Sequence, residues 1–270
     1  MPELPDVEGF RRFLSRHATG RTIERIEVFD PELVRNRTPC SLHNALTGAR
    51  FREPRRHGKW LIAPCARESS QEADGVELLM HFGMTGALSW SDVGAPRHRH
   101  DRLVFVCQGG ELRYNNMRRF GGVWLAADAG ERAAITGPLG PDAAALTLDQ
   151  FLALTGRRRG AIKAALMDQF LVAGLGNLMC DEIMWRARVH PATPVSALSL
   201  SRRRRVFEQL RAVVGESTRY GRVPHGERWL TRVRDDRSAV CPRCGTGLRW
   251  ARIAGRTTCW CPKCQRRRSG

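Results

Sequence analysis

Two Cys-x-x-Cys pairs lie near the end of this 270-residue chain, separated by sixteen residues. Each pair can bind a tetrahedral ion through a tight turn, and four thiolates at ~2.3 Å are typical ligands of structural Zn²⁺. The intervening residues suit a β-hairpin that returns the second pair to the first. Cys259 would face the same side of a strand as Cys261, but each pair encloses a proline and a basic residue, and this symmetry favours Cys261. The sequence predicts one structural zinc ion, without an open catalytic position, held by Cys241, Cys244, Cys261 and Cys264.

The second candidate for chemistry is the amino terminus, where Pro2 becomes the first residue if the initiator methionine is removed. An α-amino group has a pKa of about 8, against about 10.4 for a lysine side chain. Part of such an amine is therefore unprotonated at neutral pH, and it can attack an aldehyde or acetal carbon to form an iminium ion. Glu3 is adjacent and suited to proton transfer.

The charge of the chain indicates its partner. There are 45 Lys and Arg residues against 27 Asp and Glu residues, a formal net charge of +18. This excess favours a polyanion, either nucleic acid or an anionic membrane surface. The sequence contains no run of about 18 apolar residues, so no transmembrane helix is predicted. It also contains no basic amphipathic helix, which disfavours binding to a membrane surface.

Composition sets the class and the compartment. With 42% hydrophobic and 27% charged residues, the chain is an ordinary globular protein, neither disordered nor collagen-like. The acidic start is not a secretory signal, and nine cysteines, an odd number, suit a reducing compartment better than a disulfide framework. We expect a soluble, intracellular protein.

The elements that must position these residues fall into two regions. Apolar residues at helical spacing predict a helix over 6–17. Short β-prone runs separated by Gly, Pro and Asp then predict a β-sandwich or barrel. From about residue 146 the periodicity is helical, with a tight turn at Gly174–Asn177. The predicted strands are 23–29, 60–63, 77–82, 103–106, 112–114 and 123–125, and the later helices are 148–154, 161–169, 177–187 and 198–216.

The predicted fold class is α+β with several domains. A β-sandwich domain with an N-terminal helix is expected over residues 1–130, and an Ala-, Gly- and Pro-rich linker over 131–145. A helical domain over 146–237 and a zinc finger over 238–270 complete the chain.

Taken together, these motifs resemble the formamidopyrimidine-DNA glycosylase/endonuclease VIII family in order and spacing, from residue 1 to residue 265. The resemblance identifies the helical region as a helix–two-turns–helix DNA-binding domain. The motifs that carry it are Met1-Pro-Glu-Leu-Pro-Asp-Val-Glu8, His57-Gly-Lys59, His81-Phe-Gly-Met84, Arg118-Arg-Phe-Gly121, Leu171-Val-Ala-Gly-Leu-Gly-Asn177 and the four-cysteine tail.

The resemblance implies a bifunctional DNA glycosylase and AP lyase of base excision repair. Pro2 would attack C1′ of a flipped, damaged nucleotide, release the base and leave a Schiff base, and β- and δ-elimination would then cut the strand. Glu3 would transfer protons. Asp6 stands where the family normally has Glu, and Lys59 resembles the lysine that contacts phosphate and assists at the lesion.

The same resemblance assigns contacts to double-stranded damaged DNA. Met84, Arg118 and Phe120 match the trio that fills the space left by a flipped base. Asn177 matches the asparagine of the helix–two-turns–helix element, where Gly174 and Gly176 would let the backbone approach phosphate. Arg256 resembles the phosphate-clamping arginine of the finger, and His100 is a further candidate for phosphate contact. The run Arg202–Arg205 is interpreted as a solvated helix face.

Departures from the family pattern bear on the substrate. Leu4 favours the formamidopyrimidine branch, and hence oxidised purines such as 8-oxoguanine and formamidopyrimidines. However, Asn116-Met117 replaces the usual Asp-Pro, and the segment 220–237 is Arg-rich, with Trp229 as its only large apolar residue. Oxidised pyrimidines or bulky alkylated bases are the alternative substrates.

Two other functions remain open. A non-catalytic protein that binds damaged DNA would keep the architecture, although the presence of Pro2, Glu3 and Lys59 together disfavours it. A zinc-ribbon transcription or RNA-binding factor would explain the tail and the charge but not the amino terminus. For the enzyme we expect a cytoplasmic, nucleoid-associated monomer of bacterial type.

Overall fold

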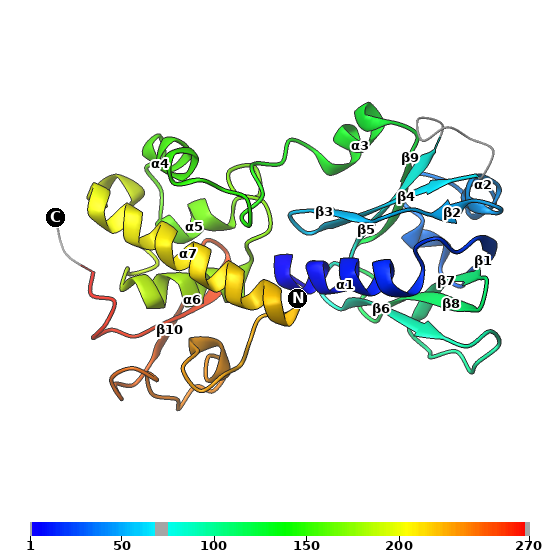
Figure 1. Ribbon diagram of the computed structural model, residues 1–270. Coiled ribbons are helices and arrows are strands. Elements are labelled where there is room, and N and C mark those ends of the chain that lie inside the picture. The colour runs from blue at the N-terminus through cyan, green and yellow to red at the C-terminus, as the bar shows by residue number, and fades with distance from the viewer. Residues whose placement is uncertain (1, 68–74, 268–270) are drawn as a thin grey trace. The chain divides into compact units, whose positions relative to one another are not determined.

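The computed structural model describes residues 2–67 and 75–267 (Figure 1). Met1, residues 68–74 and residues 268–270 lie outside the described residues. The chain divides into two compact units. The first contains Pro2 and residues 6–138, and the second contains Glu3–Pro5 and the chain from Leu139 onward.

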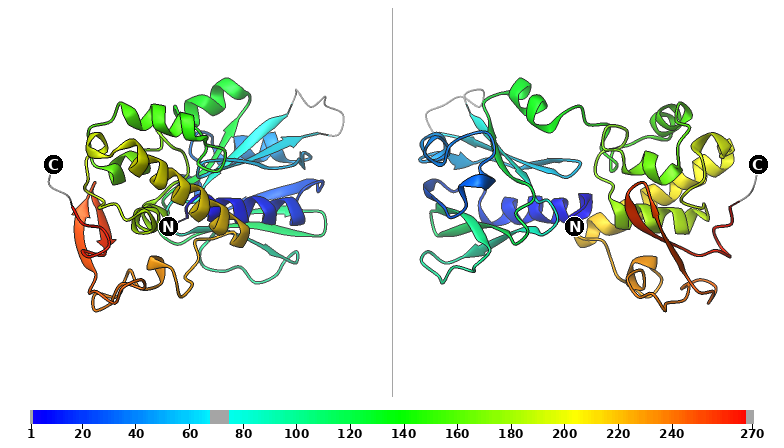
Figure 2. Two further views of the ribbon diagram at one scale, coloured as in Figure 1. Left: turned by 60° about the vertical axis from the view of Figure 1, so that its left-hand side comes forward. Right: turned by 180° about the vertical axis from the view of Figure 1, so that it is seen from behind.

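The first unit is built on two antiparallel sheets, which both views of Figure 2 show as separate layers. In the four-stranded sheet the order is β1 (Ile23–Val28), β7 (Asp101–Cys107), β8 (Gly110–Asn116) and β6 (Gly86–Ser91). In the five-stranded sheet the order is β2 (Arg50–Phe51), β4 (Trp60–Ala66), β5 (Val76–His81) and β9 (Gly122–Ala126), with β3 (Arg55–His57) paired to β4.

The core of this unit lies where the apolar faces of both sheets meet. Leu61 and Leu78 come from the five-stranded sheet, and Leu103 and Phe105 from the four-stranded one, all fully buried in one cluster. Helices α1 (Leu4–His17) and α2 (Pro39–Leu46) add Val7, Leu14, Leu42 and Leu46 to the same cluster. The predicted β-sandwich flanked by helices is confirmed, whereas β2, β3, β6 and α2 were not predicted.

The second unit contains the predicted helices. They are α4 (Leu148–Gly156), α5 (Ile162–Met167), α6 (Asn177–Ala187) and α7 (Leu200–Tyr220), followed by the hairpin of β10 (Arg249–Ile253) and β11 (Arg256–Trp260). Ser199 caps α7 by accepting a hydrogen bond from the Arg202 N–H, and Gly221 ends it in the left-handed conformation. The helical periodicity predicted these four helices, and the caps set where α7 begins and ends.

The stretch expected to be a linker, 131–145, differs from that expectation. Helix α3 (Ala129–Thr136) occupies its beginning and belongs to the first unit, because Asp128 caps it through the Glu131 N–H (2.8 Å) and Ile135 packs against the outer face of the five-stranded sheet. The residues after Pro138 belong to the second unit, where Ala143 is buried in the helical core.

The zinc finger was also expected to be a separate module, but a buried ionic network ties it to the helices of the second unit. Asp181 of α6 pairs with Lys163 Nζ (2.7 Å) and with Arg234 Nε (2.9 Å), and it accepts the Cys259 N–H (3.2 Å). Lys163 also donates to Thr258 Oγ1 of β11 (2.7 Å). Lys163 and Asp181 are fully buried, so each charge depends on its partner for stability.

Within the described ranges, 2–67 and 75–267, the helices are all too short or too polar to cross a bilayer.

Replacement of Asp181 by alanine should destabilise the second unit by about 3–5 kcal/mol, because it leaves the buried Lys163 charge without a counter-ion. Urea denaturation monitored by tryptophan fluorescence measures this change. Asp235→Ala is the matched control, since it removes the exposed carboxylate that also pairs with Arg234 and should cost at most about 1 kcal/mol. Equal effects of the two substitutions would contradict the role given to the buried network.

Candidate active site and nucleic-acid interface

Glu3 is held at the amino-terminal end of α6. Its carboxylate accepts three backbone N–H groups, those of Gly176 (2.9 Å), Leu178 (2.8 Å) and Met179 (3.2 Å). These are amides that a helix start leaves without intrahelical partners, and the positive end of the helix dipole favours a carboxylate there. Glu3 is fully buried, and its carboxylate therefore has a fixed position.

The glycines of the turn are required by this arrangement. A Cβ on Gly176 would lie 2.3 Å from Glu3 Cδ, and a Cβ on Gly174 would lie 2.6 Å from Leu4 Cδ1. Gly174 also has a φ of +107°, which disfavours other residues, and its carbonyl accepts the Leu4 N–H (3.0 Å). Close packing of the amino-terminal residues thus explains these glycines without reference to DNA.

The other candidate catalytic residues occupy the first unit. Pro2 is partly exposed, directly before α1, and Asp6 lies partly exposed in the first turn of that helix. Lys59 stands in the turn from β3 to β4, next to Gly58, whose φ of +57° makes the turn. Pro2 and Asp6 are thereby placed along one short segment, whereas Lys59 comes from the sheet.

His81, at the end of β5, organises the loop that carries Met84. Its Nδ1 accepts the Gly83 N–H (3.2 Å), and its carbonyl accepts the hydroxyl of the buried Tyr114 (2.9 Å). Burial and the positive charge of Lys59 lower the pKa of His81 to about 4. The imidazole is therefore neutral at physiological pH, as its acceptor role requires.

Two of the three predicted void-filling residues lie together. Arg118 Nη1 is 3.6 Å from Met84 Sδ, and the Arg118 N–H donates to Thr85 Oγ1 (3.0 Å). Phe120, close by in sequence, leaves 54% of its surface exposed. The structure thus presents a thioether, a guanidinium and an exposed ring from neighbouring loops of one unit.

Asn116, a departure from the family pattern, holds these loops. Its side chain donates to Tyr114 Oη (3.1 Å) and to the Phe120 carbonyl (2.6 Å). Its Oδ1 accepts the Thr85 hydroxyl (3.2 Å) and the Arg119 N–H (3.1 Å). Asn116 is fully buried, so this amide meets its hydrogen-bonding needs by fixing Thr85 and Phe120. Its position beside Arg118-Arg-Phe120 was the only signal in the sequence for this role.

Arg119, beside Arg118, has a structural role that was not predicted. It adopts a left-handed conformation (φ 58°) and pairs with both oxygens of Asp30 (2.7 and 2.9 Å) and with Glu32 (2.7 Å). Its charge is therefore used within the first unit. Of the two neighbouring arginines, Arg118 is the one that contacts Met84.

Asn177 begins α6 and links it to the finger hairpin. Its Nδ2 donates to the Thr257 carbonyl (3.0 Å), which also accepts from Arg234 (2.7 Å). This contact fixes the hairpin whose turn, Ala254-Gly255, precedes the exposed Arg256. The structure thus brings Asn177 and the hairpin of Arg256 together, although the Asn177 amide reaches protein backbone where a phosphate contact was predicted.

His100 lies partly exposed in the turn before β7, next to the buried Asp101. Desolvation, followed by the nearby charges of Arg99, His98 and Arg102, lowers its pKa. A neutral ring can donate one hydrogen bond to a phosphate but adds no charge.

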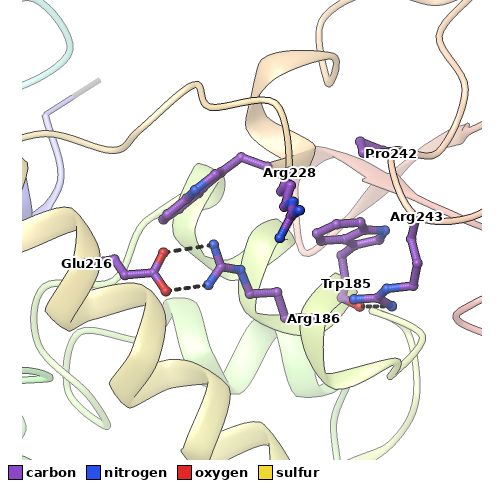
Figure 3. Close-up of a pocket in the computed structure, with 7 residues that line it drawn as sticks. Trp185, Arg186, Glu216, Arg228, Pro242 and Arg243 are labelled. Atoms are coloured by element: carbon purple, nitrogen blue, oxygen red, sulfur yellow. Dashed lines mark hydrogen bonds and ion pairs between the residues drawn. The ribbon is translucent and has the colours of Figure 1, made fainter.

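The Arg-rich segment after α7 is anchored at its centre. Trp229 is only 7% exposed and stacks on Arg186 (4.2 Å), which pairs with Glu216 of α7 through two hydrogen bonds (3.0 and 3.1 Å; Figure 3). The Leu230 N–H donates to the buried Glu182 (2.8 Å). Trp229 is therefore a packing residue. A cavity of about 510 Å³ lies beside this contact. Its lining residues are Trp185, Arg186, Glu216, Arg228, Trp229, Pro242 and Arg243.

The four predicted zinc ligands form one cluster, with all sulfur atoms within 4.8 Å of one another. A tetrahedral ion with Zn–S distances of ~2.3 Å needs sulfurs about 3.8 Å apart, and Cys244 Sγ lies 3.6 Å from Cys261 Sγ and 3.5 Å from Cys264 Sγ. The residues fit a zinc ion. Trp185 Nε1 also donates to Cys241 Sγ (3.3 Å), an outer contact that orients a ligand.

Cys259 is buried outside this cluster and points to a different environment. Burial raises the pKa of its thiol to about 12. The structure places Cys261, and not Cys259, in the cluster with the other three cysteines, as the symmetry of the two pairs suggested.

The protein should lose stability as the pH falls from about 6.5 towards 4, because the unfolded chain then binds a proton that folded His81 rejects. Above the pKa of about 6.5 in the unfolded chain, neutral His81 does not reduce the free energy of unfolding. Between pH 7.5 and pH 5 we expect this free energy to fall by about 2 kcal/mol. Urea denaturation of the wild type and of His81→Gln at both pH values measures it, and the substitution should abolish that part. His43→Gln, on α2, serves as the control and should keep the full dependence.

Comparison with known families now places the chain. Residues 1–123 match the formamidopyrimidine-DNA glycosylase N-terminal domain, and residues 138–225 match the formamidopyrimidine-DNA glycosylase H2TH domain, the helix–two-turns–helix element.

Whole-length relatives agree with these matches. The formamidopyrimidine-DNA glycosylase of Methylococcus capsulatus is 34% identical over 98% of this chain and 100% of its own length, and that of Geobacter metallireducens is 35% identical with the same coverage.

Solved structures give the same result in three dimensions. Lactococcus lactis Fpg bound to DNA containing N7-benzyl-Fapy-dG superposes with a TM-score of 0.86 at 28% identity, covering 98% of this chain and 100% of that one. MutM in complex with carbocyclic 8-oxo-G DNA gives 0.86 at 29% identity with the same coverage. With an unbroken match along sequence and fold, the chain belongs to the formamidopyrimidine-DNA glycosylase family of DNA repair enzymes.

Proposed function

We propose that this glycosylase is bifunctional and that it excises oxidised purines through an N-terminal proline Schiff base, followed by β,δ-elimination. The observation that carries the proposal is the fixed carboxylate of Glu3, bound by three amides of α6 and directly following Pro2 in the chain. A nucleophile next to an immobilised proton carrier is the arrangement that this chemistry requires.

The first step joins the unprotonated amine of Pro2 to C1′ of the damaged nucleotide. The N-glycosidic bond breaks, its electron pair leaves with the base, and a proton supplied at the site neutralises the departing base. Opening of the sugar ring gives the iminium ion. Loss of a C2′ proton then expels the 3′ phosphate, and a second elimination expels the 5′ phosphate. Glu3 carries protons in these steps, with Asp6 and Lys59 as further candidates.

Extrusion of the base costs a few kcal/mol of pairing and stacking. In the proposal, Met84, Arg118 and the exposed ring of Phe120 fill the vacated space and recover part of this cost. The contact between Arg118 and Met84 and the hydrogen bonds of Asn116 to the same loops support a preformed wedge. Asn177, Arg256 and His100 are proposed to contact phosphate.

The proposed substrate class follows the relatives. Similar solved complexes contain DNA with a Fapy-dG or a carbocyclic 8-oxo-G, which are purine lesions, and one contains an N7-benzyl-Fapy-dG, a purine lesion with a bulky alkyl group. Oxidised pyrimidines or bulky alkylated bases remain the second candidate, favoured by the anchored, Arg-rich segment after α7, in which Trp229 is packed against Arg186. We further propose that the enzyme acts as a cytoplasmic, nucleoid-associated monomer.

Zinc is proposed as the structural ion of the finger, held by Cys241, Cys244, Cys261 and Cys264. When bound, it would supply folding free energy and no catalytic chemistry, because four thiolates complete its tetrahedron.

Borohydride trapping tests the chemistry. Wild-type protein incubated with abasic-site duplex and borohydride should give a covalent adduct on the amino-terminal peptide. Pro2→Gly should abolish it, and Glu3→Gln should slow base release by about 10²–10⁴-fold. Pro5→Ala is the matched proline control and should still form the adduct. Intact mass must show loss of the initiator methionine.

Duplexes that carry 8-oxoguanine, a formamidopyrimidine or thymine glycol then define the substrate. Cleavage of the first two in preference to the third supports oxidised purines, and the reverse order supports the second candidate. If the wild type forms no adduct, or if an N-terminally extended chain still nicks lesion DNA, the Pro2 mechanism is wrong.

Removal of zinc should unfold the finger, since binding in comparable peptides contributes about 10–16 kcal/mol. Cys244→Ser should lose the metal and weaken binding to abasic-site DNA, as native mass spectrometry and fluorescence anisotropy can measure. Cys259→Ala is the control, because Cys259 belongs to the same finger but lies outside the cluster, and it should retain one zinc per chain. Retention of zinc by Cys244→Ser would refute the ligand assignment.

A further inference from the structure

A second basic cavity of the second unit is not used by the proposed chemistry. Its volume is about 410 Å³. Its walls come from the end of α6, from the first turns of α7 and from the second Cys-x-x-Cys pair of the finger with the residues after it. In Figure 1 the red C-terminal segment and the beginning of α7 lie at the same end of this unit. The lining residues are Arg188, Ser199, Ser201, Arg202, Arg205, Lys263, Cys264 and Arg266.

The charge of this cavity is the first argument for a ligand. Five of the eight lining residues are Arg or Lys, and the other three are Ser199, Ser201 and Cys264 of the cysteine cluster. Like charges gathered around one hollow repel each other, and low-dielectric walls strengthen the positive potential inside it. A bound anion offsets this repulsion, whereas a neutral or cationic ligand does not.

The direction of α7 adds to this field. Its first turn contains Arg202 and no acidic residue, although the positive end of a helix dipole favours acidic side chains there. Cations at that end oppose helix stability by a few tenths of a kcal/mol or more each. Arg202 therefore does not serve the helix dipole, and it lines the cavity together with Arg205 and with Ser199 and Ser201, whose hydroxyls contact each other (3.0 Å).

The cavity is distinct from the DNA contacts assigned above. Asn177 stands at the first residue of α6 and Arg188 caps its other end. Eleven helical residues separate the two positions by about 16 Å. A phosphate in the cavity would therefore lie well away from the Asn177 turn.

We propose that this cavity is an additional phosphate-binding site, and that the phosphodiester backbone of DNA outside the lesion supplies its ligand. The guanidinium groups of Arg188, Arg202, Arg205 and Arg266 offer charge-assisted hydrogen bonds to phosphate oxygens, and Lys263 adds a point charge. Occupation of the site would lengthen the DNA footprint without adding base specificity. The DNA source rests on the proposed function, whereas the phosphate chemistry does not.

Two charge reversals test the site, each with an adjacent control. Arg205→Glu and Arg266→Glu change lining residues, and Arg204→Glu and Arg267→Glu make the same change in net charge at neighbours outside the lining. The first readout is calorimetric titration of the zinc-loaded protein with tripolyphosphate at low salt. The wild type and both controls should bind tripolyphosphate, and the affinity of the lining variants for it should be at least about tenfold lower.

The second readout compares abasic-site duplexes of 12 and 30 base pairs across a salt series. If DNA supplies the phosphate, the longer duplex should bind the wild type more tightly, and each lining substitution should remove this gain and lower the salt slope by about one relative to its control. Cleavage of the short duplex should be unchanged in all four variants.

The possible outcomes are separable. Tripolyphosphate binding without a length effect keeps the phosphate site and assigns it to a free polyphosphate. Absence of both effects, or equal losses in lining and control variants, overturns the proposal. Failure of the wild type to cleave any lesion would count against the proposed function alone, since the titration does not depend on it.

Discussion

The contact between the Glu3 carboxylate and the first amides of α6 is the constraint on which the rest of the site depends. The carboxylate accepts hydrogen bonds from amides that a helix start leaves unpaired, and these three bonds fix the position of the residue next to Pro2. Gly176 must lack a side chain for it to form. One interaction therefore stabilises the start of α6 and fixes the position of the proposed proton carrier.

A second set of contacts extends this order to the finger. Asp181 lies one turn after Asn177 in α6 and pairs with Lys163 and Arg234. Lys163 and Arg234 in turn bind Thr258 and Thr257 of β11, and Thr257 is also the residue that Asn177 contacts. Because the network is buried, its charges favour one arrangement of helix and hairpin over others. The proposed phosphate contacts of Asn177 and Arg256 thus depend on residues that never need to touch DNA.

Local patterns in the sequence predicted local structure well. Helix α6 begins and ends where its spacing indicated, and the symmetry of the cysteine pairs selected the correct four sulfurs. Contacts between distant residues were not predictable in this way. Glu3 and Gly176 are 173 positions apart, and nothing in the composition around Asn116 shows that its amide joins Thr85 to Phe120. Helix α2 was missed although Thr38-Pro39 is a regular capping signal, because its apolar run is short.

The separation of Glu3 from its amide partners also has a consequence for biosynthesis. At roughly 5–20 residues per second, α6 leaves the ribosome on the order of ten to thirty seconds after the amino terminus. Throughout that interval the first residues have no helix to bind. Glu3 therefore becomes buried only after α6 has been synthesised, and the first residues of the nascent chain stay accessible until then.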